Sequence, residues 1–176
     1  GLTAGNALEV RESVEVLAGG GPADVVELTV VLAREMLDAA GVHGPDPAEV
    51  LADGRAMDSW RRMIAAQGGD PDAPLPMARE QHVVLAPATG VLATLDAMAV
   101  GLAAWRLGAG RARKEDPVSA GAGVEMHAKP GDLVTAGEPL LTLHTDEPDR
   151  FEAALAGLDA GIVVAPEGSE VRRLPL

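Results

Sequence analysis

The stretch Gly123–Asp146, GVEMHAKPGDLVTAGEPLLTLHTD, decides the fold of the second half of the chain. Residues 124–128 and 132–146 contain short apolar runs rich in Val, Leu and Thr, which are typical of β-strands. The turn Lys129–Asp132 separates them, and its Pro-Gly pair breaks regular structure. We therefore predict a strand, a tight turn and a further strand, the elements of a small antiparallel sheet.

Outward from this stretch, apolar runs and turn residues predict more strands and two helices. Two short strands are expected around a Pro/Gly turn in 82–96, and another in 161–166. Helices are expected over 97–108, where small residues allow close approach to a sheet, and over 148–160. His127 and His144 lie within expected strands and could meet across them. Residues 81–176 therefore form the mixed part of an α+β (α/β) fold.

Residues 1–67 read as entirely helical. Asn6 is expected to cap the first helix with its side-chain oxygen, and Pro22 to begin a second helix that reaches about Ala40. The apolar stripe of this second helix is broad, which predicts burial on much of its circumference. Two more helices are expected at 47–52, capped by Asp46, and at 55–67, with Trp60, Met63 and Ile64 facing inward.

The segment 68–80 changes character, because GGDPDAPLPM concentrates proline and glycine and can hold neither a helix nor a central strand. We read it as a linker or crossing segment between a helical part, 1–67, and an α+β part, 81–176.

Composition excludes several classes of function. The 176 residues include 27 acidic and 14 basic side chains, a formal net charge of -13 that repels nucleic acid and anionic lipid. No apolar run is long enough to span a bilayer, and no secretory signal is visible. The chain has no cysteine, which rules out thiolate chemistry and is compatible with the cytoplasmic location that we expect.

The stretch 107–124, LGAGRARKEDPVSAGAGV, raises the question of a phosphate-binding loop. Such loops place glycines before a helix, where backbone N–H groups converge on the anion. Here the glycines follow a helix, so Gly108 or Gly110 is better read as the residue that ends it. Arg111, Arg113 and Lys114 then lie near the negative helix end. A mobile loop and a plain solvated loop both remain open.

No other cluster of side chains predicts a catalytic or metal site. His43, His82, His127 and His144 lack metal-ligand partners at short spacing, and we read them as structural. The acidic pairs at 115–116 and 146–147 read as solvated charge in loops. No serine nucleophile motif is present.

The residues from Lys129 to Leu140 follow the pattern KxGDxVxxGExL and resemble the hairpin of lipoyl and biotinyl carrier domains. This resemblance implies a sandwich-like hairpin fold. Carrier domains place a lysine on an exposed hairpin after this run, where the present chain has HTDEPDR. The resemblance therefore argues against an attached prosthetic group.

Longer segments resemble thymidine and pyrimidine nucleoside phosphorylases. GNALEVRESVEVLAGGGPADVVELTVVLAREML, GRAMDSWRRMIAAQGGD, VGLAAWRLGAGRARKEDPVSAGAGVEMHAKPGD and AGEPLLTLHTD occur in this order. The resemblance covers nearly the whole chain and implies the C-terminal part of such an enzyme. It implies reversible phosphorolysis of thymidine or other pyrimidine (deoxy)nucleosides to the free base and a (deoxy)ribose 1-phosphate, with no cofactor in the chemical step.

In that family the residues that bind phosphate and base lie upstream of the segments found here. The resemblance thus implies that this chain holds no catalytic residue, is inactive alone, and needs the N-terminal half of the same enzyme. The full-length enzyme is expected to be a homodimer. An autonomous lipoyl-like binding or scaffold module, without a prosthetic group, is the alternative.

The resemblance also assigns two sets of site residues. The loop Gly110–Pro117, with Gly108, Gly110, Arg111, Arg113 and Lys114, corresponds to a loop that orders when the two domains close around substrate. Thr3, through its carbonyl oxygen, and Glu12, through its carboxylate, correspond to ligands of a structural potassium ion. Without the resemblance, Glu12 reads as a solvated or ion-paired helix residue.

Overall fold

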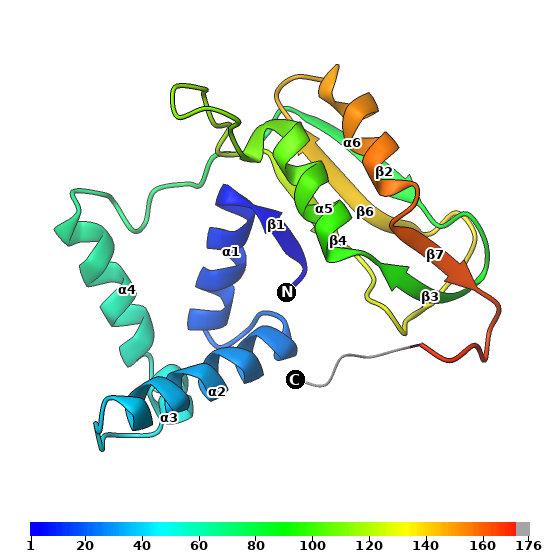
Figure 1. Cartoon of the computed structure of the whole chain (residues 1–176). Coiled ribbons are helices and arrows are strands. Elements are labelled where there is room, and N and C mark those ends of the chain that lie inside the picture. The colour runs from blue at the N-terminus through cyan, green and yellow to red at the C-terminus, as the bar shows by residue number, and fades with distance from the viewer. Residues whose placement is uncertain (172–176) are drawn as a thin grey trace. The chain divides into compact units, whose positions relative to one another are not determined.

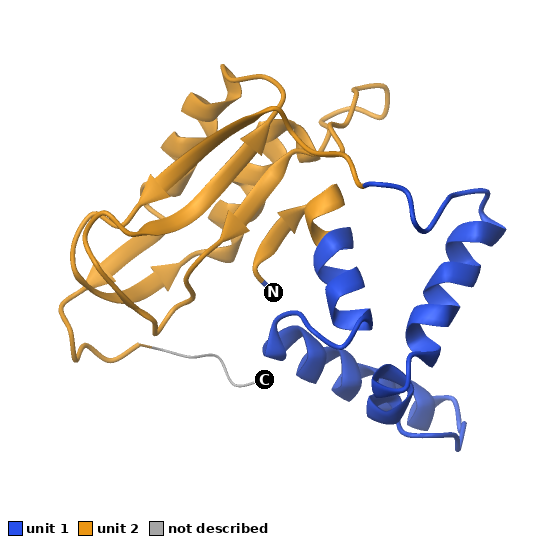
Figure 2. Ribbon diagram, turned by 180° about the vertical axis from the view of Figure 1, so that it is seen from behind, with its two compact units in different colours: residues 1, 10–74 blue, residues 2–9, 75–176 orange. Residues whose placement is uncertain are grey.

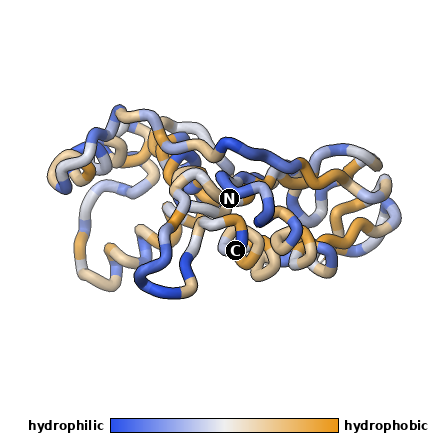
Figure 3. The backbone as a smooth tube through the Cα atoms, turned by 90° about the horizontal axis from the view of Figure 1, so that it is seen from above, coloured by the Kyte–Doolittle hydropathy of each residue, from blue (hydrophilic) through white to orange (hydrophobic). Residues whose placement is uncertain are grey.

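The computed structural model describes residues 1–171, and its chain divides into two compact units (Figure 2). Unit 1 contains Gly1 and residues 10–74 and is helical. Unit 2 contains residues 2–9 and the chain from Leu75 onward, and it holds all the described strands. One of these strands is Thr3–Gly5, so the prediction that residues 1–67 are entirely helical is wrong there, because the segment pairs with a strand more than 100 residues away. Residues 67–79 carry no helix or strand. The backbone in Figure 3 mixes polar and apolar residues throughout, and no described helix is long and apolar enough to cross a membrane.

Four helices lie in the first part of the chain: α1 (Asn6–Leu17), α2 (Ala23–Ala39), α3 (Pro47–Ala52) and α4 (Arg55–Ala66). The predicted cap of α3 is confirmed, because Asp46 Oδ1 accepts from Ala48 N at 2.7 Å and Pro47 is the first helical residue. Pro22 occupies the N-cap position of α2 instead of the first helical position. The pKa of Asp46 is held below its usual range by the hydrogen bond that Arg34 donates.

The prediction that Asn6 caps α1 with its side-chain oxygen is wrong. Asn6 is the first residue of the helix, and its side chain donates to the carbonyl oxygens of Ala109 and Ser119. Glu9 fulfils the capping role, because its Oε1 accepts from Gly5 N at 2.7 Å. A glutamate one turn into a helix can reach back to the N–H groups at the helix start, as in a capping box.

The prediction that α2 is buried around much of its circumference is also wrong. Only Val30 among its residues is buried, whereas Leu28, Leu32 and Met36 are 45%, 52% and 71% exposed. On α4, Met63 is exposed as well, against the prediction that it faces inward. The apolar stripes of both helices exist in the sequence, but unit 1 offers them too little apolar surface to pack against.

Unit 2 contains two antiparallel sheets, which confirms the mixed α+β class (Figure 1). The four-stranded sheet has the order β1-β4-β6-β2 and the three-stranded sheet the order β5-β3-β7. Their strands are β1 (Thr3–Gly5), β2 (Glu80–Leu85), β3 (Gly90–Leu95), β4 (Gly123–Met126), β5 (Leu133–Val134), β6 (Pro139–Thr145) and β7 (Ile162–Ala165). The turn predicted at 129–132 carries the chain from β4 in one sheet to β5 in the other. The strands that follow one another here are therefore not paired with each other.

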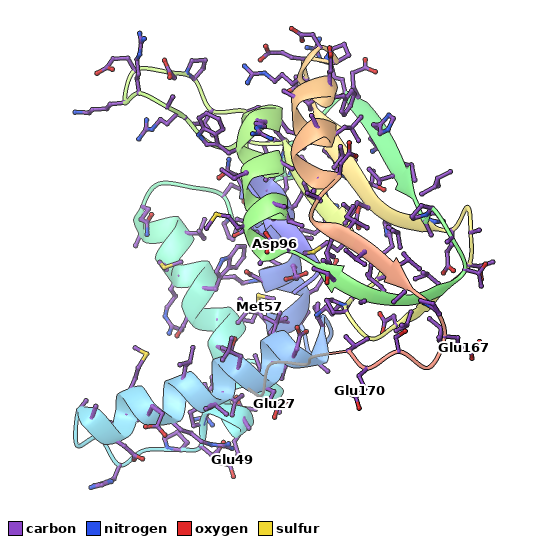
Figure 4. The ribbon with its side chains drawn as sticks, turned by 45° about the vertical axis from the view of Figure 1, so that its right-hand side comes forward. Glu27, Glu49, Met57, Asp96, Glu167 and Glu170 are labelled. Carbon is purple, nitrogen blue, oxygen red and sulfur yellow. The ribbon has the colours of Figure 1, made fainter. Side chains whose placement is uncertain are left out.

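Unit 2 also contains two helices, α5 (Ala97–Ala104) and α6 (Arg150–Leu158), which pack against each other and against the four-stranded sheet. A π-helical turn, η1 (Trp105–Ala109), extends α5. Asp96, labelled in Figure 4, starts α5 because its Oδ1 accepts from Ala99 N at 2.7 Å. Strand β6 lies between two others, and all its residues after Pro139 are buried. Leu107, Leu141, Leu143 and Leu158 form part of the aliphatic core that joins the helices to the sheet.

The pair Gly5 and Gly123 lets β1 and β4 approach closely. The two glycines face each other across the antiparallel pair. A Cβ on Gly5 would lie 2.5 Å from the carbonyl oxygen of Ala122, and a Cβ on Gly123 would lie 2.5 Å from that of Ala4. Such distances leave no room for any other residue type, so the close pairing of these strands depends on glycine.

Candidate functional site

The basic loop that follows η1 begins at a sharp turn of the backbone. Gly108 has φ +110°, a conformation that favours glycine because other residues carry a Cβ. Gly108 thus interrupts the helical geometry inside η1, whereas Gly110, with an extended backbone, occupies the C-cap position after it. The carbonyl oxygen of Gly108 accepts from Ser119 N at 2.9 Å and closes the base of the loop.

Polar contacts hold the base of this loop to its surroundings. Asn6 Nδ2 donates to Ala109 O at 2.8 Å, and Thr145 Oγ1 donates to Leu107 O at 2.7 Å. Ser119 Oγ donates to Asp146 Oδ2 at 2.9 Å. The two ends of the loop are therefore fixed to the start of α1 and to the end of β6, while the tip extends from them.

The tip of the loop forms a small turn of its own. Asp116 Oδ2 accepts from Arg113 N at 2.8 Å, and Arg111 Nη1 donates to Lys114 O at 2.9 Å. The side chains of Arg111, Arg113 and Lys114 are exposed. Because Arg113 N–H already donates to a carboxylate within the loop, the backbone does not present the convergent free donors of a phosphate cradle.

Asp146 is a site residue that the sequence reading missed, since it was interpreted as solvated charge. Its carboxylate accepts from Ser119 Oγ and from Arg79 N, at 3.1 Å, and lies 3.4 Å from the Arg79 guanidinium. These contacts, the Ser119 hydrogen bond foremost, hold the pKa of Asp146 below its usual range. Glu147 is likewise paired, with Arg150 at 3.0 Å. The position of Asp146 at the end of the apolar segment 132–146 is the signal in the sequence that marks it.

We expect the Asp146→Asn variant to lose part of the acid sensitivity of the protein. Because the folded-state pKa of Asp146 is lowered, its contribution to stability is present above the ordinary carboxyl pKa of about 3.9 and is lost as the pH falls through the folded pKa. Urea unfolding at a series of pH values between about 6 and 2.5 measures this. Asp159→Asn, at an exposed helix end, is the matched control, and equal pH profiles for both variants would contradict the assignment.

Thr3 and Glu12, the predicted potassium ligands, lie in different units. Thr3 is in β1, opposite Glu125 of β4, and its Oγ1 is buried without a hydrogen-bond partner. Glu12 lies in the part of α1 that belongs to unit 1. Among the 171 described residues, no group of three or more His, Asp or Glu side chains could hold a metal ion. The potassium site therefore stays a prediction from the resemblance.

His144 lies in β6, as predicted, whereas His127 follows the last residue of β4 instead of lying within a strand. His144 is paired across the sheet with Gly123, and its Nε2 lies 3.5 Å from Glu125 Oε2. His127 Nε2 lies 2.7 Å from Thr142 Oγ1. These neighbours fit the structural interpretation of both residues.

Comparison with known proteins gives consistent matches. A family model described as the pyrimidine nucleoside phosphorylase C-terminal domain matches residues 91–165. Thymidine phosphorylase of Mycobacterium tuberculosis (strain H37Rv) is 58% identical over 174 residues, which are 99% of this chain and 41% of that protein. Pyrimidine-nucleoside phosphorylase of Bacillus subtilis (strain 168) is 36% identical over 178 residues, 95% of this chain and 41% of that protein. The chain thus spans about two fifths of the length of these curated relatives.

Proposed function

Because this chain belongs to the thymidine and pyrimidine-nucleoside phosphorylase family, whose C-terminal part it matches, we propose that it is the C-terminal portion of such an enzyme. The reaction is phosphorolysis, in which phosphate displaces the pyrimidine from C1′ of a (deoxy)nucleoside and leaves a (deoxy)ribose 1-phosphate. The observation that carries the proposal is the identity of 58%, which extends over 99% of the chain instead of being confined to one motif.

The role that we propose for this portion is structural and positional. Phosphorolysis requires two polar substrates to be held in line and water to be kept from competing as the nucleophile. In our proposal the groups that touch substrate belong to the N-terminal portion, and no residue of this chain is catalytic. The chain supplies one wall of a cleft that closes during turnover.

We assign the closing segment of this wall to the basic loop, with Gly108, Gly110, Arg111, Arg113 and Lys114. The hydrogen bonds at the base of this loop and the exposure of its tip support this assignment. Asn6 and Ser119 fix its base, while its exposed tip offers three cationic side chains whose donors could reach an opposing surface. A fixed base with a free tip is suited to a segment that orders on closure.

The partner that we propose is the N-terminal portion of the same enzyme. Unit 1 supports this, because within residues 10–74, all of them described, Val16 and Val30 are the buried apolar side chains. An apolar groove of about 600 Å³ remains open between α2 and α3, lined by residues that include Val30, Leu37, Val50 and Leu51. Exposed apolar surface of this extent marks an interaction site. We further propose that residues 1–67 belong to the large α/β domain of the enzyme.

Further expectations concern the full-length enzyme. We propose that it is a cytoplasmic homodimer, and that Thr3 and Glu12 contribute two oxygen ligands to a structural potassium ion. No metal or organic cofactor takes part in the proposed chemical step.

A second candidate is a lipoyl-like binding or scaffold module without a prosthetic group. The observation that favours it is the turn Lys129–Asp132, which carries the chain from one sheet to the other as expected for a hairpin sandwich. The sequence DEPDR after β6 contains no lysine for attachment. Capture of a specific protein other than the N-terminal portion, at the surface of unit 2, would favour this candidate.

Mixing the two portions tests the proposed function. The chain is combined with the N-terminal three fifths of the Mycobacterium tuberculosis relative, and thymine release from thymidine is followed with and without phosphate. We expect no release by either part alone and phosphate-dependent release by the mixture. Size-exclusion chromatography of the same samples reports assembly. Parts that co-elute without turnover, or that fail to associate, would contradict the proposal, as would turnover by the chain alone.

The assignment of the closing loop gives a separate prediction. Replacing Arg111, Arg113 and Lys114 by serine in the reconstituted enzyme should lower kcat by about 10- to 100-fold, because closure positions the substrates. The melting temperature should be unchanged, since these side chains are exposed. The double variant Arg61→Ser and Arg62→Ser on α4 controls for the loss of positive charge. If it lowers kcat as much as the loop variant does, the proposed role of the loop in closure is contradicted.

A further inference from the structure

A pocket of about 520 Å³ lies in unit 2, between the basic loop, η1 and the start of α6. Its lining side chains include one indole, three guanidinium groups and two carboxylates: Trp105, Arg106, Arg111, Asp116, Asp149 and Arg150. Three basic and two acidic side chains line this pocket, in a chain whose net charge is -13, and one of the basic groups, Arg150, is paired with Glu147 beside it.

The guanidinium groups are anchored but keep unused donors. Arg106 Nη1 donates to Ala153 O at 3.1 Å, which holds its side chain along α6. Arg150 Nη1 donates to Arg106 O at 3.3 Å, and its Nη2 pairs with Glu147. The Nε of Arg150 is buried and has no hydrogen-bond partner. Each guanidinium has five N–H donors, more than these contacts use, so an anion in this pocket would find further donors on the same side chains.

The indole of Trp105 supplies a flat apolar wall. It is 44% exposed, and it packs against the backbone of Gly110, where a Cβ would overlap the ring. This contact restricts the ring without covering it. Exposed aromatic rings of this kind stack on the planar rings of ligands, nucleobases included. The stacking energy depends little on which base is present.

The carboxylates narrow the class of ligand. Asp149 is exposed, whereas Asp116 is half-buried and its Oδ2 already accepts from Arg113 N. Both carboxylates would repel a bare anion, but their remaining lone pairs can accept hydrogen bonds from hydroxyl or ring N–H groups. The pocket therefore suits one molecule with a phosphate for the guanidinium groups, hydroxyl groups for the carboxylates and a planar ring for the indole.

We propose that this pocket binds a nucleoside monophosphate. The ring stacks on Trp105, the phosphate pairs with Arg111 and the free donors of Arg106 and Arg150, and the sugar hydroxyls donate to Asp149 and Asp116. The inference stands on the pocket of unit 2 alone and is independent of phosphorolysis. Because Arg111 and Asp116 belong to the basic loop, the bound ligand also holds the loop in place.

Tryptophan fluorescence tests the proposal with the full chain. The sequence has two tryptophans, so Trp60→Phe leaves Trp105 as the only indole. We expect uridine 5′-monophosphate to quench this emission saturably, with a Kd below about 1 mM. Uridine alone and inorganic phosphate alone should bind at least about tenfold more weakly, because each lacks part of the contacts. Calorimetric titration of the unaltered chain repeats the measurement without the substitution.

Two arginines of one loop provide the matched variants. Arg111→Ala removes a group that lines the pocket and should raise Kd by about tenfold or more, the loss of one charge-assisted hydrogen bond. Arg113→Ala removes the same charge two residues away, outside the lining, and should change Kd by less than about twofold. The absence of saturable binding would overturn the proposal. So would equal losses in both variants, which indicate general charge attraction, or equal affinity for inorganic phosphate, which indicates a simple anion site.

Discussion

The Leu143→Ala variant is expected to have a free energy of unfolding lower by about 3–5 kcal/mol than that of the unaltered chain. Leu143 is fully buried in β6, where it pairs with Val124 of β4 on one side and His82 of β2 on the other. Removing its side chain loses apolar burial and leaves a cavity that the surrounding aliphatic side chains can only partly fill. Urea unfolding followed by far-ultraviolet circular dichroism measures the change.

Leu85→Ala is the matched control for this variant. Leu85 ends the edge strand β2 of the same sheet, but its side chain is 51% exposed. The same chemical change should therefore cost less than about 1 kcal/mol. If the two substitutions had similar effects, β6 would not form the centre of the core as described here.

The Gly123→Val variant should lose the pairing of β1 with β4, with a cost of about 3 kcal/mol or more. A Cβ at this position would lie 2.5 Å from Ala4 O and 2.8 Å from Leu8 Cδ1. One of these atoms belongs to the backbone, so a change of rotamer cannot relieve the overlap. Increased amide exchange in β1 and at the start of α1, compared with the unaltered chain, would locate the damage.

Gly101→Ala is the control for adding a side chain to a glycine. Gly101 lies within α5, and a Cβ there would meet nothing within 4 Å. Since alanine is the better helix former, the variant should be as stable as the unaltered chain or more stable by up to about 1 kcal/mol. If this control lost as much stability as Gly123→Val, the close approach of β1 and β4 would not be the reason why Gly123→Val is destabilised.

Local patterns in the sequence were sufficient for most of the secondary structure. The Asp46-Pro47 pair predicted the start of α3. The apolar runs on either side of the turn Lys129–Asp132 predicted strands before and after that turn.

Burial was predicted less well than secondary structure. The stripe of α2 is apolar enough to be buried, yet Leu32 and Met36 are exposed, because burial depends on what packs against a stripe and not on the stripe alone.

The candidate site was predictable only where one residue type is needed for a local reason. The glycines after α5 predicted the helix end to within Gly108 or Gly110, because a positive φ favours glycine, and the positive φ is found at Gly108. The partners of Asn6 and Asp146 could not be predicted, since Asn6 contacts the loop 103 residues away and Asp146 contacts Arg79 67 residues away. Such contacts follow from the way the strands pair. They leave no periodic signal in the sequence.

The measurement that tests the central claim most directly is the activity of a covalent chimera. In it, this chain replaces the matching C-terminal 174 residues of the Mycobacterium tuberculosis thymidine phosphorylase. The reaction followed is phosphate-dependent release of thymine from thymidine. We predict a kcat/KM within about tenfold of the unaltered relative, since in our proposal the groups that touch substrate all belong to the retained N-terminal portion. A chimera that folds, as judged by a cooperative thermal transition, and yet releases no thymine would contradict the account.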